Sequence, residues 1–404
     1  MPLFYVISHY SNLPFRAWEQ RKLRDFTKIS QGLQIAISDR YLENGDNREL
    51  YITNEFLNTY SSPKYYIENP PENVIANEDD ILMTRTGNTG KVITNVIGAF
   101  HNNFFKIDYN PMKTSKLFLY YVLVSENIQK EILIKAGTST IPDLKHNDFY
   151  SIVIQVPKIQ EQQKIGDFFK QLDNTIALHQ RKLDALKKMK KGFLQQMFPK
   201  SEEDVPKIRF TDFNGNWRQR KLEEVADRVR GNDRRMELPT LTISASKGWL
   251  NQHDRFFGNI AGKEQKNYTL LKKGQLSYNH GNSKSAKYGA VFVLRTYDEA
   301  LVPRIYHSFK TNILANSDFI EYLFATKIPD RELRKIVSSG ARMDGLLNIN
   351  FNDFMSILIM LPFVEEQIKI SNSLIRLDKI ISLYQNKLDQ LIKLKKAYLQ
   401  YLFI

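Results

Sequence analysis

The sequence predicts an α+β protein with two globular domains in tandem, separated by two long antiparallel coiled-coil helices with pseudo-twofold symmetry. Three observations support this fold class. The second half of the chain repeats parts of the first, a long heptad-spaced segment closes each half, and short strand-like runs alternate with helical segments inside each half. With 404 residues, the chain is long enough for two or three domains that each bury a core.

The internal repeat is clearest at the end of each half. Residues 148–198 align with residues 353–403 without a gap, and roughly half of the aligned positions are identical. A second match links Trp18–Gly32 to Trp217–Gly231 at the front of each half. Between these anchors the similarity nearly disappears. Each half therefore consists of a fixed opening segment, a divergent body and a fixed closing segment.

The closing segments are predicted to be long helices. Pro157 and Pro362 suit a helix start, the first helix is expected from about Glu161 to Phe198, and Pro199 ends it. Apolar residues then recur at spacings of three and four over about four heptads, which indicates a coiled-coil seam. Each helix is the obvious partner of the other, in an antiparallel pair. The seam and subunit-interface residues are predicted to be Ile165, Leu172, Ile176, Leu183, Leu186, Phe193, Ile370, Leu377, Ile381, Leu388, Leu391 and Tyr398.

The same alignment predicts the domain boundaries. Residues 1–157 form a first domain, 158–200 a central helical spacer, 201–361 a second domain and 362–404 a C-terminal helix. Within the bodies, residues 115–136 and 317–339 each open on a serine that is suited to cap a helix. Short β-branched runs at 150–156, 289–294 and 354–361 predict strands.

Composition narrows the possible functions. The net charge of +14 favours nucleic acid or an anionic membrane surface as a partner, although residues 1–157 carry 16 Lys and Arg against 17 Asp and Glu. The absence of cysteine excludes thiolate sites and fits a reducing, cytoplasmic location. No apolar run is long enough to span a membrane, so no membrane partner is expected. No zinc-site spacing, nucleotide-binding loop or catalytic constellation is found.

The order of these segments resembles the specificity (S) subunits of type I restriction-modification systems. The matching motifs are W-x-Q-R-K-L from Trp18 and Trp217, P-x-x-x-E-Q from Pro157 and Pro362, and K-L-D-x-L followed by K-K-x-x-L-Q-x-x-F in both helices. The resemblance implies two target recognition domains that each read half of a bipartite double-stranded DNA site. It also implies that the helices dock methyltransferase (M) subunits, expected to be two, and that restriction (R) subunits join for cleavage.

The resemblance further implies that this chain is noncatalytic and binds no cofactor itself. S-adenosylmethionine is expected on the M subunits, and ATP and Mg on the R subunits. Because the two bodies differ in sequence, their half-sites are expected to differ, and the target to be an asymmetric, interrupted site. The divergent bodies, rather than the repeated helices, are therefore the place to look for sequence recognition.

Two loops at corresponding points of the repeat carry the side chains that DNA contacts require. Both follow strand-like runs, and both mix glycine with amide, hydroxyl and basic residues. A solvated hairpin turn is the alternative interpretation, because Gly, Asn and Thr also favour turns. The predicted DNA-binding residues are Arg85, Thr86, Asn88, Thr89, Lys91, Asn279, His280, Asn282, Ser283, Lys284, Lys287 and Tyr288, with Arg304, Tyr306 and Arg342 as additions.

Other interpretations remain open at this point. The basic helix face at Lys187, Lys188, Lys190 and Lys191 suits solvent, DNA phosphates or an acidic partner surface. The alternative function is a coiled-coil scaffold whose two α+β domains bind RNA or proteins. A self-sufficient methyltransferase or nuclease is a further rival, and it requires S-adenosylmethionine binding or catalysis by the isolated chain.

Overall fold

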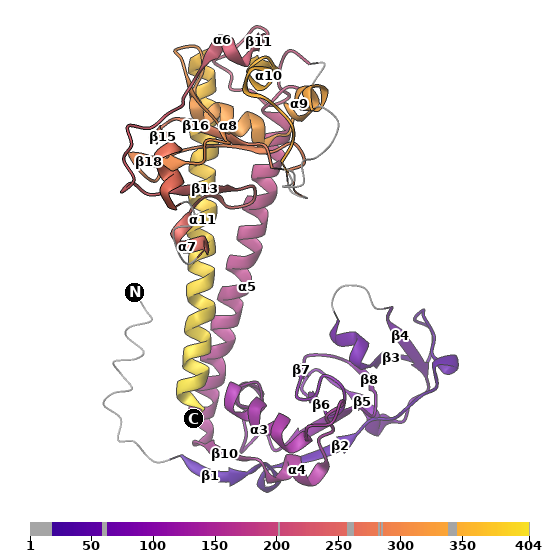
Figure 1. Cartoon of the computed structure of the whole chain (residues 1–404). Coiled ribbons are helices and arrows are strands. Elements are labelled where there is room, and N and C mark those ends of the chain that lie inside the picture. The colour runs from indigo at the N-terminus through magenta and orange to yellow at the C-terminus, as the bar shows by residue number, and fades with distance from the viewer. Residues whose placement is uncertain are drawn as a thin grey trace. The chain divides into compact units, whose positions relative to one another are not determined.

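The computed structural model describes residues 18–58, 63–200, 203–256, 262–281, 283, 286–337 and 346–403. The chain divides into two compact units that both mix helices and strands (Figure 1). The first unit joins Met1–Gln180 to Asn386–Ile404, and the second is Arg181–Gln385. Each unit thus holds part of both long helices, and the domain boundaries predicted from the sequence stay predictions.

The first unit contains two four-stranded sheets. One has the order β2-β9-β6-β7 with antiparallel neighbours, and the other has the order β4-β3-β8-β5 with a parallel pair between β3 and β8. A separate pair joins β1 to β10. The strands are β1 (Glu19–Lys22), β2 (Thr27–Gln31), β3 (Arg48–Ile52), β4 (Tyr65–Glu68), β5 (Ile75–Ala76), β6 (Ile81–Thr84), β7 (Val92–Thr94), β8 (Gly98–Phe100), β9 (Phe104–Tyr109) and β10 (Val153–Val156).

Three short helices complete this unit: α2 (Lys116–Leu123), α3 (Glu126–Ala136) and α4 (His146–Ser151). The single helical segment predicted at 115–136 is therefore two helices, broken at Val124 and Ser125. The predicted cap is confirmed, because the Ser115 side chain accepts a hydrogen bond from the backbone N–H of Phe118.

The second unit has the matching four-stranded antiparallel sheet, in the order β12-β19-β16-β17. Three two-stranded sheets join β11 to β20, β13 to β14 and β15 to β18. The strands are β11 (Arg218–Lys221), β12 (Ala226–Arg228), β13 (Leu241–Ser244), β14 (Gly248–Asn251), β15 (Thr269–Lys272), β16 (Leu276–Asn279), β17 (Ala290–Val293), β18 (Glu299–Val302), β19 (His307–Thr311) and β20 (Leu358–Leu361).

One predicted helix cap in this unit is wrong. Asn316, not Ser317, caps α8: its Oδ1 accepts from the Phe319 N–H at 2.9 Å, and Ser317 is the first helical residue. Asn occupies this position as well as Ser does, because both present an oxygen to the free N–H groups. The helices are α6 (Leu222–Val225), α7 (Gln252–Phe256), α8 (Ser317–Ala325), α9 (Asp330–Ile336) and α10 (Phe351–Met355).

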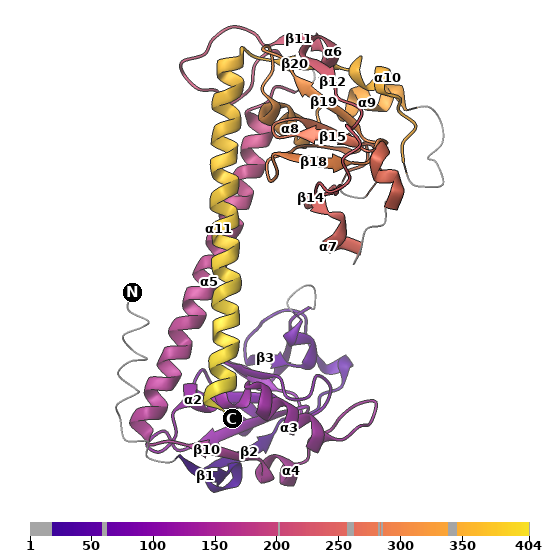
Figure 2. The same ribbon diagram turned by 60° about the vertical axis from the view of Figure 1, so that its left-hand side comes forward.

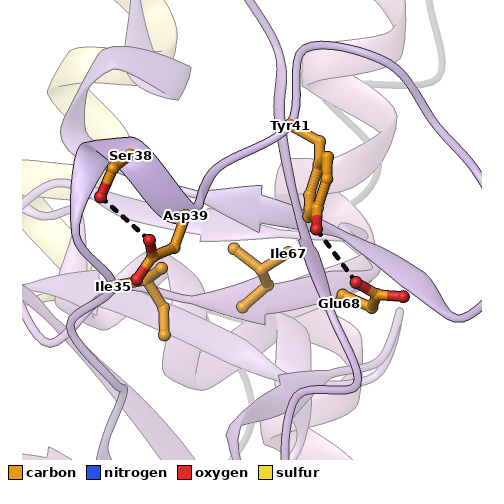
Figure 3. A pocket seen from close by; sticks show the side chains of 6 residues that line it. All are labelled: Ile35, Ser38, Asp39, Tyr41, Ile67 and Glu68. Carbon is orange, nitrogen blue, oxygen red and sulfur yellow. Dashed lines mark hydrogen bonds between the residues drawn. The ribbon is translucent and has the colours of Figure 1, made fainter.

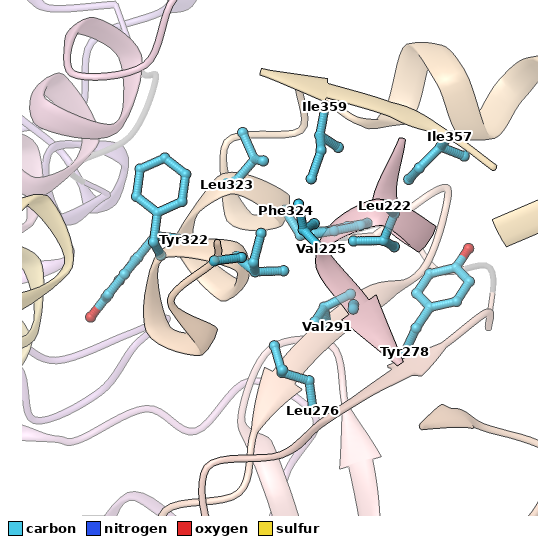
Figure 4. Packing of buried hydrophobic residues seen from close by; sticks show 14 of the residues in the cluster. Leu222, Val225, Leu276, Tyr278, Val291, Tyr322, Leu323, Phe324, Ile357 and Ile359 are labelled. Carbon is cyan, nitrogen blue, oxygen red and sulfur yellow. The ribbon is translucent and has the colours of Figure 1, made fainter. Parts of the chain in front are cut away.

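The core of the second unit lies between its sheet and α8 (Figure 4). Leu276 and Tyr278 of β16 and Val291 of β17 pack with Leu323 and Phe324 of α8. Alternation along β16 places Leu276 and Tyr278 on this face, as expected for a strand with one face on the core. The first unit builds its core in the same way around α2.

The long helices α5 (Ile159–Gln196) and α11 (Val364–Leu402) run antiparallel, as predicted. In the first unit the Phe168 ring lies 5.3 Å from Tyr398, and Lys395 Nζ lies 2.5 Å from Asp173 Oδ1. Later residues of α5 thus meet earlier residues of α11. In the second unit Lys190 Nζ lies 2.6 Å from Asp378 Oδ1.

Equivalent side chains tie each unit to both long helices. In the first, the Tyr121 hydroxyl of α2 donates to Asp173 of α5 at 2.8 Å, and Lys395 of α11 lies over the Tyr121 ring. In the second, the Tyr322 hydroxyl of α8 donates to Asp378 of α11, and Lys190 of α5 lies over the Tyr322 ring. Lys190 of the basic face is therefore engaged in an internal ion pair.

The residues predicted to form the seam divide into three groups. Leu172, Leu183, Leu377, Leu388 and Leu391 are buried. Ile165 and Ile370 are also buried, but they belong to the domain cores rather than to the seam alone. The remaining predicted residues are half-buried: Ile176, Leu186, Phe193, Ile381 and Tyr398.

Candidate nucleic-acid interface

In each unit, the loop predicted to contact DNA begins at one end of the four-stranded antiparallel sheet. In the first unit, β6 ends at Thr84, which pairs with Phe104 at the start of β9, and Phe105 pairs with Gln31 at the end of β2. The loop after β6, the approach to β9 and the exit from β2 therefore meet. We call this region, residues 31–34, 85–91 and 101–105, the first sheet end.

The second unit repeats the arrangement. Tyr278 near the end of β16 pairs with His307 at the start of β19, and β12 ends beside β19 at Arg228. The second sheet end thus comprises residues 228–231, 279–281, 283, 286–288 and 304–307. It lies against the segment that leads into α10, since the Leu347 N–H donates to the carbonyl of His280 at 2.9 Å. Figure 2 shows β12 and β19 side by side, near α10.

The loop at the first sheet end is a tight, internally bonded turn. Gly87, Asn88 and Gly90 have φ values of 62°, 51° and 89°, so the loop needs residues that tolerate left-handed backbone. Thr89 is buried and its hydroxyl donates to the Pro142 carbonyl at 2.6 Å. These bonds hold the loop in one shape against residues 142–144.

The side chains of three predicted DNA-binding residues are already hydrogen-bonded within the protein at this turn. The Arg85 guanidinium pairs with Asp143 at 2.8 Å, and the Thr86 hydroxyl donates to the same carboxylate. Thr89 is held as described above. Asn88 and Lys91 are exposed. They are the members of this predicted set that remain accessible to a DNA phosphate or base.

The loop at the second sheet end is less enclosed. Ser283 and Lys287 are exposed, whereas Asn279 is held by the Ile243 carbonyl and the Gly281 N–H. The His280 side chain is buried, and its ring lies 4.9 Å from that of His307. Tyr288 is half-buried against the core. Asn282 and Lys284 lie outside the described residues.

The structure gives different results for the three additional predicted residues. Arg304 is exposed beside β19. Tyr306 is buried, and its hydroxyl bonds with Thr242 and with the N–H of Ile243, so it supports the fold rather than contacting a ligand. Arg342 lies outside the described residues.

Sequence reasoning missed several polar residues at the sheet ends. In the first, the Gln31 amide donates to the Asn102 carbonyl at 3.0 Å, and the Asn102 amide donates to Gln34. In the second, Arg228 and Arg230 are exposed at and just after the end of β12. A signal was present, because the matched segment 18–32 has Gln31 where its repeat has Arg230. This difference falls in residues 24–31 and 223–230, the part of the anchor where the two copies diverge.

Burial sets the protonation of the histidines at both sheet ends. It lowers the pKa of His307, although the bond from this ring to the Ile349 carbonyl acts in the opposite direction. Burial, followed by the charge of Arg40, also lowers the pKa of His101. Both rings are therefore neutral at pH 7.

A cavity of about 370 Å³ lies elsewhere in the first unit, lined by two carboxylates (Figure 3). The Tyr41 hydroxyl donates to Glu68 at 3.0 Å, the Ser38 hydroxyl donates to Asp39 at 2.9 Å, and Ile35 and Ile67 form its apolar wall. Its acidic lining disfavours phosphate. Over the described ranges, no group of three or more His, Asp or Glu is arranged to hold a metal ion, and no helix is long and apolar enough to cross a membrane.

Comparisons with known proteins agree with the resemblance seen in the sequence. Residues 16–188 match the family model of the type I restriction modification DNA specificity domain. A curated relative, the type I restriction enzyme MjaVIII specificity subunit of Methanocaldococcus jannaschii, is 25% identical over 406 residues, covering 95% of this chain and 92% of its own length.

Solved structures show the same fold over nearly the whole chain. The type I restriction-modification S subunit from M. genitalium aligns with a TM-score of 0.61 at 13% identity, covering 97% of this chain and 98% of the other. A chain from a structure on complex assembly and conformational transition of the type I R-M system aligns with a TM-score of 0.50 at 16% identity, over 96% and 98%. At these identities the likeness concerns the fold.

Proposed function

We propose that the chain is a specificity subunit of a type I restriction-modification system and that it reads an asymmetric, bipartite double-stranded DNA site; its likeness to that family supports this proposal. In this proposal the chain is the noncatalytic subunit, and it directs adenine methylation by two M subunits and cleavage with R subunits. The proposal places S-adenosylmethionine on the M subunits and ATP and Mg on the R subunits, with none of them on this chain. In this proposal the complex acts in the cytoplasm, together with its DNA substrate.

The observation that carries this proposal is the contrast between matched supports and unmatched sheet ends. Tyr121 and Tyr322 bond equivalent aspartates of the long helices, so each half holds its sheet in the same way. The sheet ends nevertheless present different chemistry: amides such as Gln31 in the first, arginines such as Arg228 in the second. Amide and guanidinium groups favour different bases. Two domains that are held in the same way but present different base-contacting side chains suit a DNA site whose two halves differ.

Exchanging one body tests the proposal. Residues 33–147 are replaced by the corresponding segment of another specificity subunit, and the chain is produced together with its M subunits. Single-molecule sequencing of the host DNA then gives the methylated adenines. We expect one half of the methylated motif to change and the other half to persist, because the second sheet end is untouched.

The matched control exchanges the body of the second half together with the end of β12, residues 228–352, so that Arg228 and Arg230 are replaced as well, and it should change the other half of the motif. A change in both halves after a single exchange contradicts modular reading. An RNA- or protein-binding scaffold is indicated instead if the unmodified chain with M subunits yields no methylated motif at all.

We also propose that M subunits dock on the long helices. Apolar side chains lie exposed on them, away from the seam: Leu178 of α5 is 57% exposed, and Leu383 of α11 is 68% exposed. Isolated exposed leucines are ordinary, but on helices that already bury a seam they provide a second apolar face.

Replacing Leu383 by lysine is therefore expected to weaken binding of an M subunit about 30-fold, because a charge is placed in a desolvated contact. Affinity is measured by titrating the purified chain with M subunit. The control is Ile37→Lys, which introduces the same charge at a residue that is 76% exposed outside the long helices. Unchanged affinity of the Leu383→Lys chain contradicts this docking surface.

A further inference from the structure

Arg228 is an exposed arginine without an acidic partner. It is the last residue of β12, and its guanidinium carbon lies 4.2 Å from the centre of the Phe351 ring, at the start of α10. Among the described residues its guanidinium makes no hydrogen bond or salt bridge. The nearby carboxylate of Asp227 lies 4.0 Å from Lys310 Nζ. Stacking on the ring restrains the plane of the guanidinium but leaves its in-plane N–H donors unused.

The first sheet end provides a direct comparison. Arg85 also lies over an aromatic ring, 5.6 Å from the centre of Phe105. Its donors, however, are occupied by Asp143 at 2.8 Å and by the Leu144 carbonyl. A guanidinium that is already paired has little left to offer a ligand. The second sheet end thus has an arginine with unused donors, whereas the arginine of the first sheet end is already paired.

The neighbours of Arg228 do not supply a compensating charge. His307, whose ring lies 5.6 Å from that of Phe351, is held by the Ile349 carbonyl at 2.9 Å. Arg230 is exposed two residues further along the chain. The site is therefore a flat, restrained cation with a second cation close by in sequence. A phosphate would require only charge, whereas a fixed fork of N–H donors matches two adjacent acceptors.

We propose that the second unit reads a guanine in its half of the DNA site, through bidentate bonds from Arg228 to guanine O6 and N7. This inference rests on the proposed function and specifies the ligand of one of its two readers. Guanine is the base that presents two acceptors side by side in the major groove, and arginine is the side chain whose geometry fits them. Phe351 is then a positioning residue, since it holds the guanidinium plane without contacting the base.

The test uses the full chain assembled with its M subunits. The exchange of residues 33–147 identifies the half-site that belongs to the second unit. Its guanine is then replaced by 7-deazaguanine, which lacks the N7 acceptor, or by adenine. We expect the unmodified complex to bind each altered DNA about 10- to 100-fold more weakly than the natural site.

Two variants separate recognition from general attraction. Arg228→Ala should bind the natural site more weakly and should no longer distinguish guanine from 7-deazaguanine. Arg228→Lys keeps the charge but loses the fork, so it should retain affinity for DNA of any sequence while losing the same distinction. The control, Lys273→Ala, removes an exposed cation before β16, at the opposite end of that strand, and should leave discrimination unchanged.

Three results overturn the inference while leaving the proposed function intact: a half-site without guanine, insensitivity of the unmodified complex to 7-deazaguanine, or full discrimination by Arg228→Ala or Arg228→Lys. A complex that yields no bipartite methylated motif removes the proposed function, and the inference with it.

Discussion

Replacing Arg209 by alanine is expected to lower the free energy of unfolding of the second unit by about 3–5 kcal/mol. The Glu366 side chain is only 1% exposed, and Arg209 binds its two oxygens at 2.8 and 2.7 Å. Arg209 also donates to the carbonyls of Asn214 and Gly215, which fixes the segment before β11. Without the guanidinium, a buried carboxylate is left without its partner. Urea denaturation followed by tryptophan fluorescence measures the loss.

The matched control is Arg220→Ala. Arg220 also pairs with a glutamate of the second unit, at 3.2 Å, but Glu224 is 44% exposed, so a much smaller loss than that of Arg209→Ala is expected. Combining Arg209→Ala with Glu366→Gln should recover part of the stability, because no buried charge then remains unpaired. A loss for Arg209→Ala as small as that for Arg220→Ala would show that water reaches Glu366 in solution.

The repeat in the sequence accounts for most of the architecture. Heptad spacing and the two anchors predicted both long helices and their antiparallel direction, because apolar periodicity is a local property that reads directly from the chain. The same alignment could not show how one repeated residue changes partner. Glu161 accepts a hydrogen bond from Trp18 at 3.1 Å, whereas its equivalent, Glu366, is taken by Arg209. Trp217 Nε1 accordingly has no hydrogen-bond partner among the described residues.

The site was harder to predict than the fold, because it depends on contacts between distant segments. Composition marked Arg85 as a DNA contact, yet its partner Asp143 comes from a segment that the sequence gives no reason to place beside it. Tyr306 was likewise selected by residue type but is buried through its bonds to β13. Arg228 was passed over because it sits in an anchor that was judged by its similarity. Only the sheet register brings it to the end of β16 and the start of β19.

Replacing Phe403 by alanine is expected to destabilise the first unit by about 3–5 kcal/mol, although this residue comes from the far end of the sequence. Its ring packs against Trp18, Phe118 and Phe169 at centroid distances of 6.5, 5.7 and 5.9 Å. Phe198, the equivalent residue just after the end of α5, packs against Trp217 and Phe319 in the second unit. Each α+β core is thus closed by an aromatic ring that follows the long helix of the other half.

Amide hydrogen exchange can resolve the two units separately. Phe403→Ala should speed exchange in α2 and leave α8 unchanged, whereas Phe198→Ala should do the reverse, because each ring supports one core. Tyr401→Ala, at a residue 72% exposed, is the control and should change neither. Equal effects of both phenylalanine variants on α2 and α8 would contradict separate closure. If the expected pattern is found, the repeated helix ending L-Q-x-x-F has a physical reason to be the same twice: each copy completes the core of the half it does not belong to.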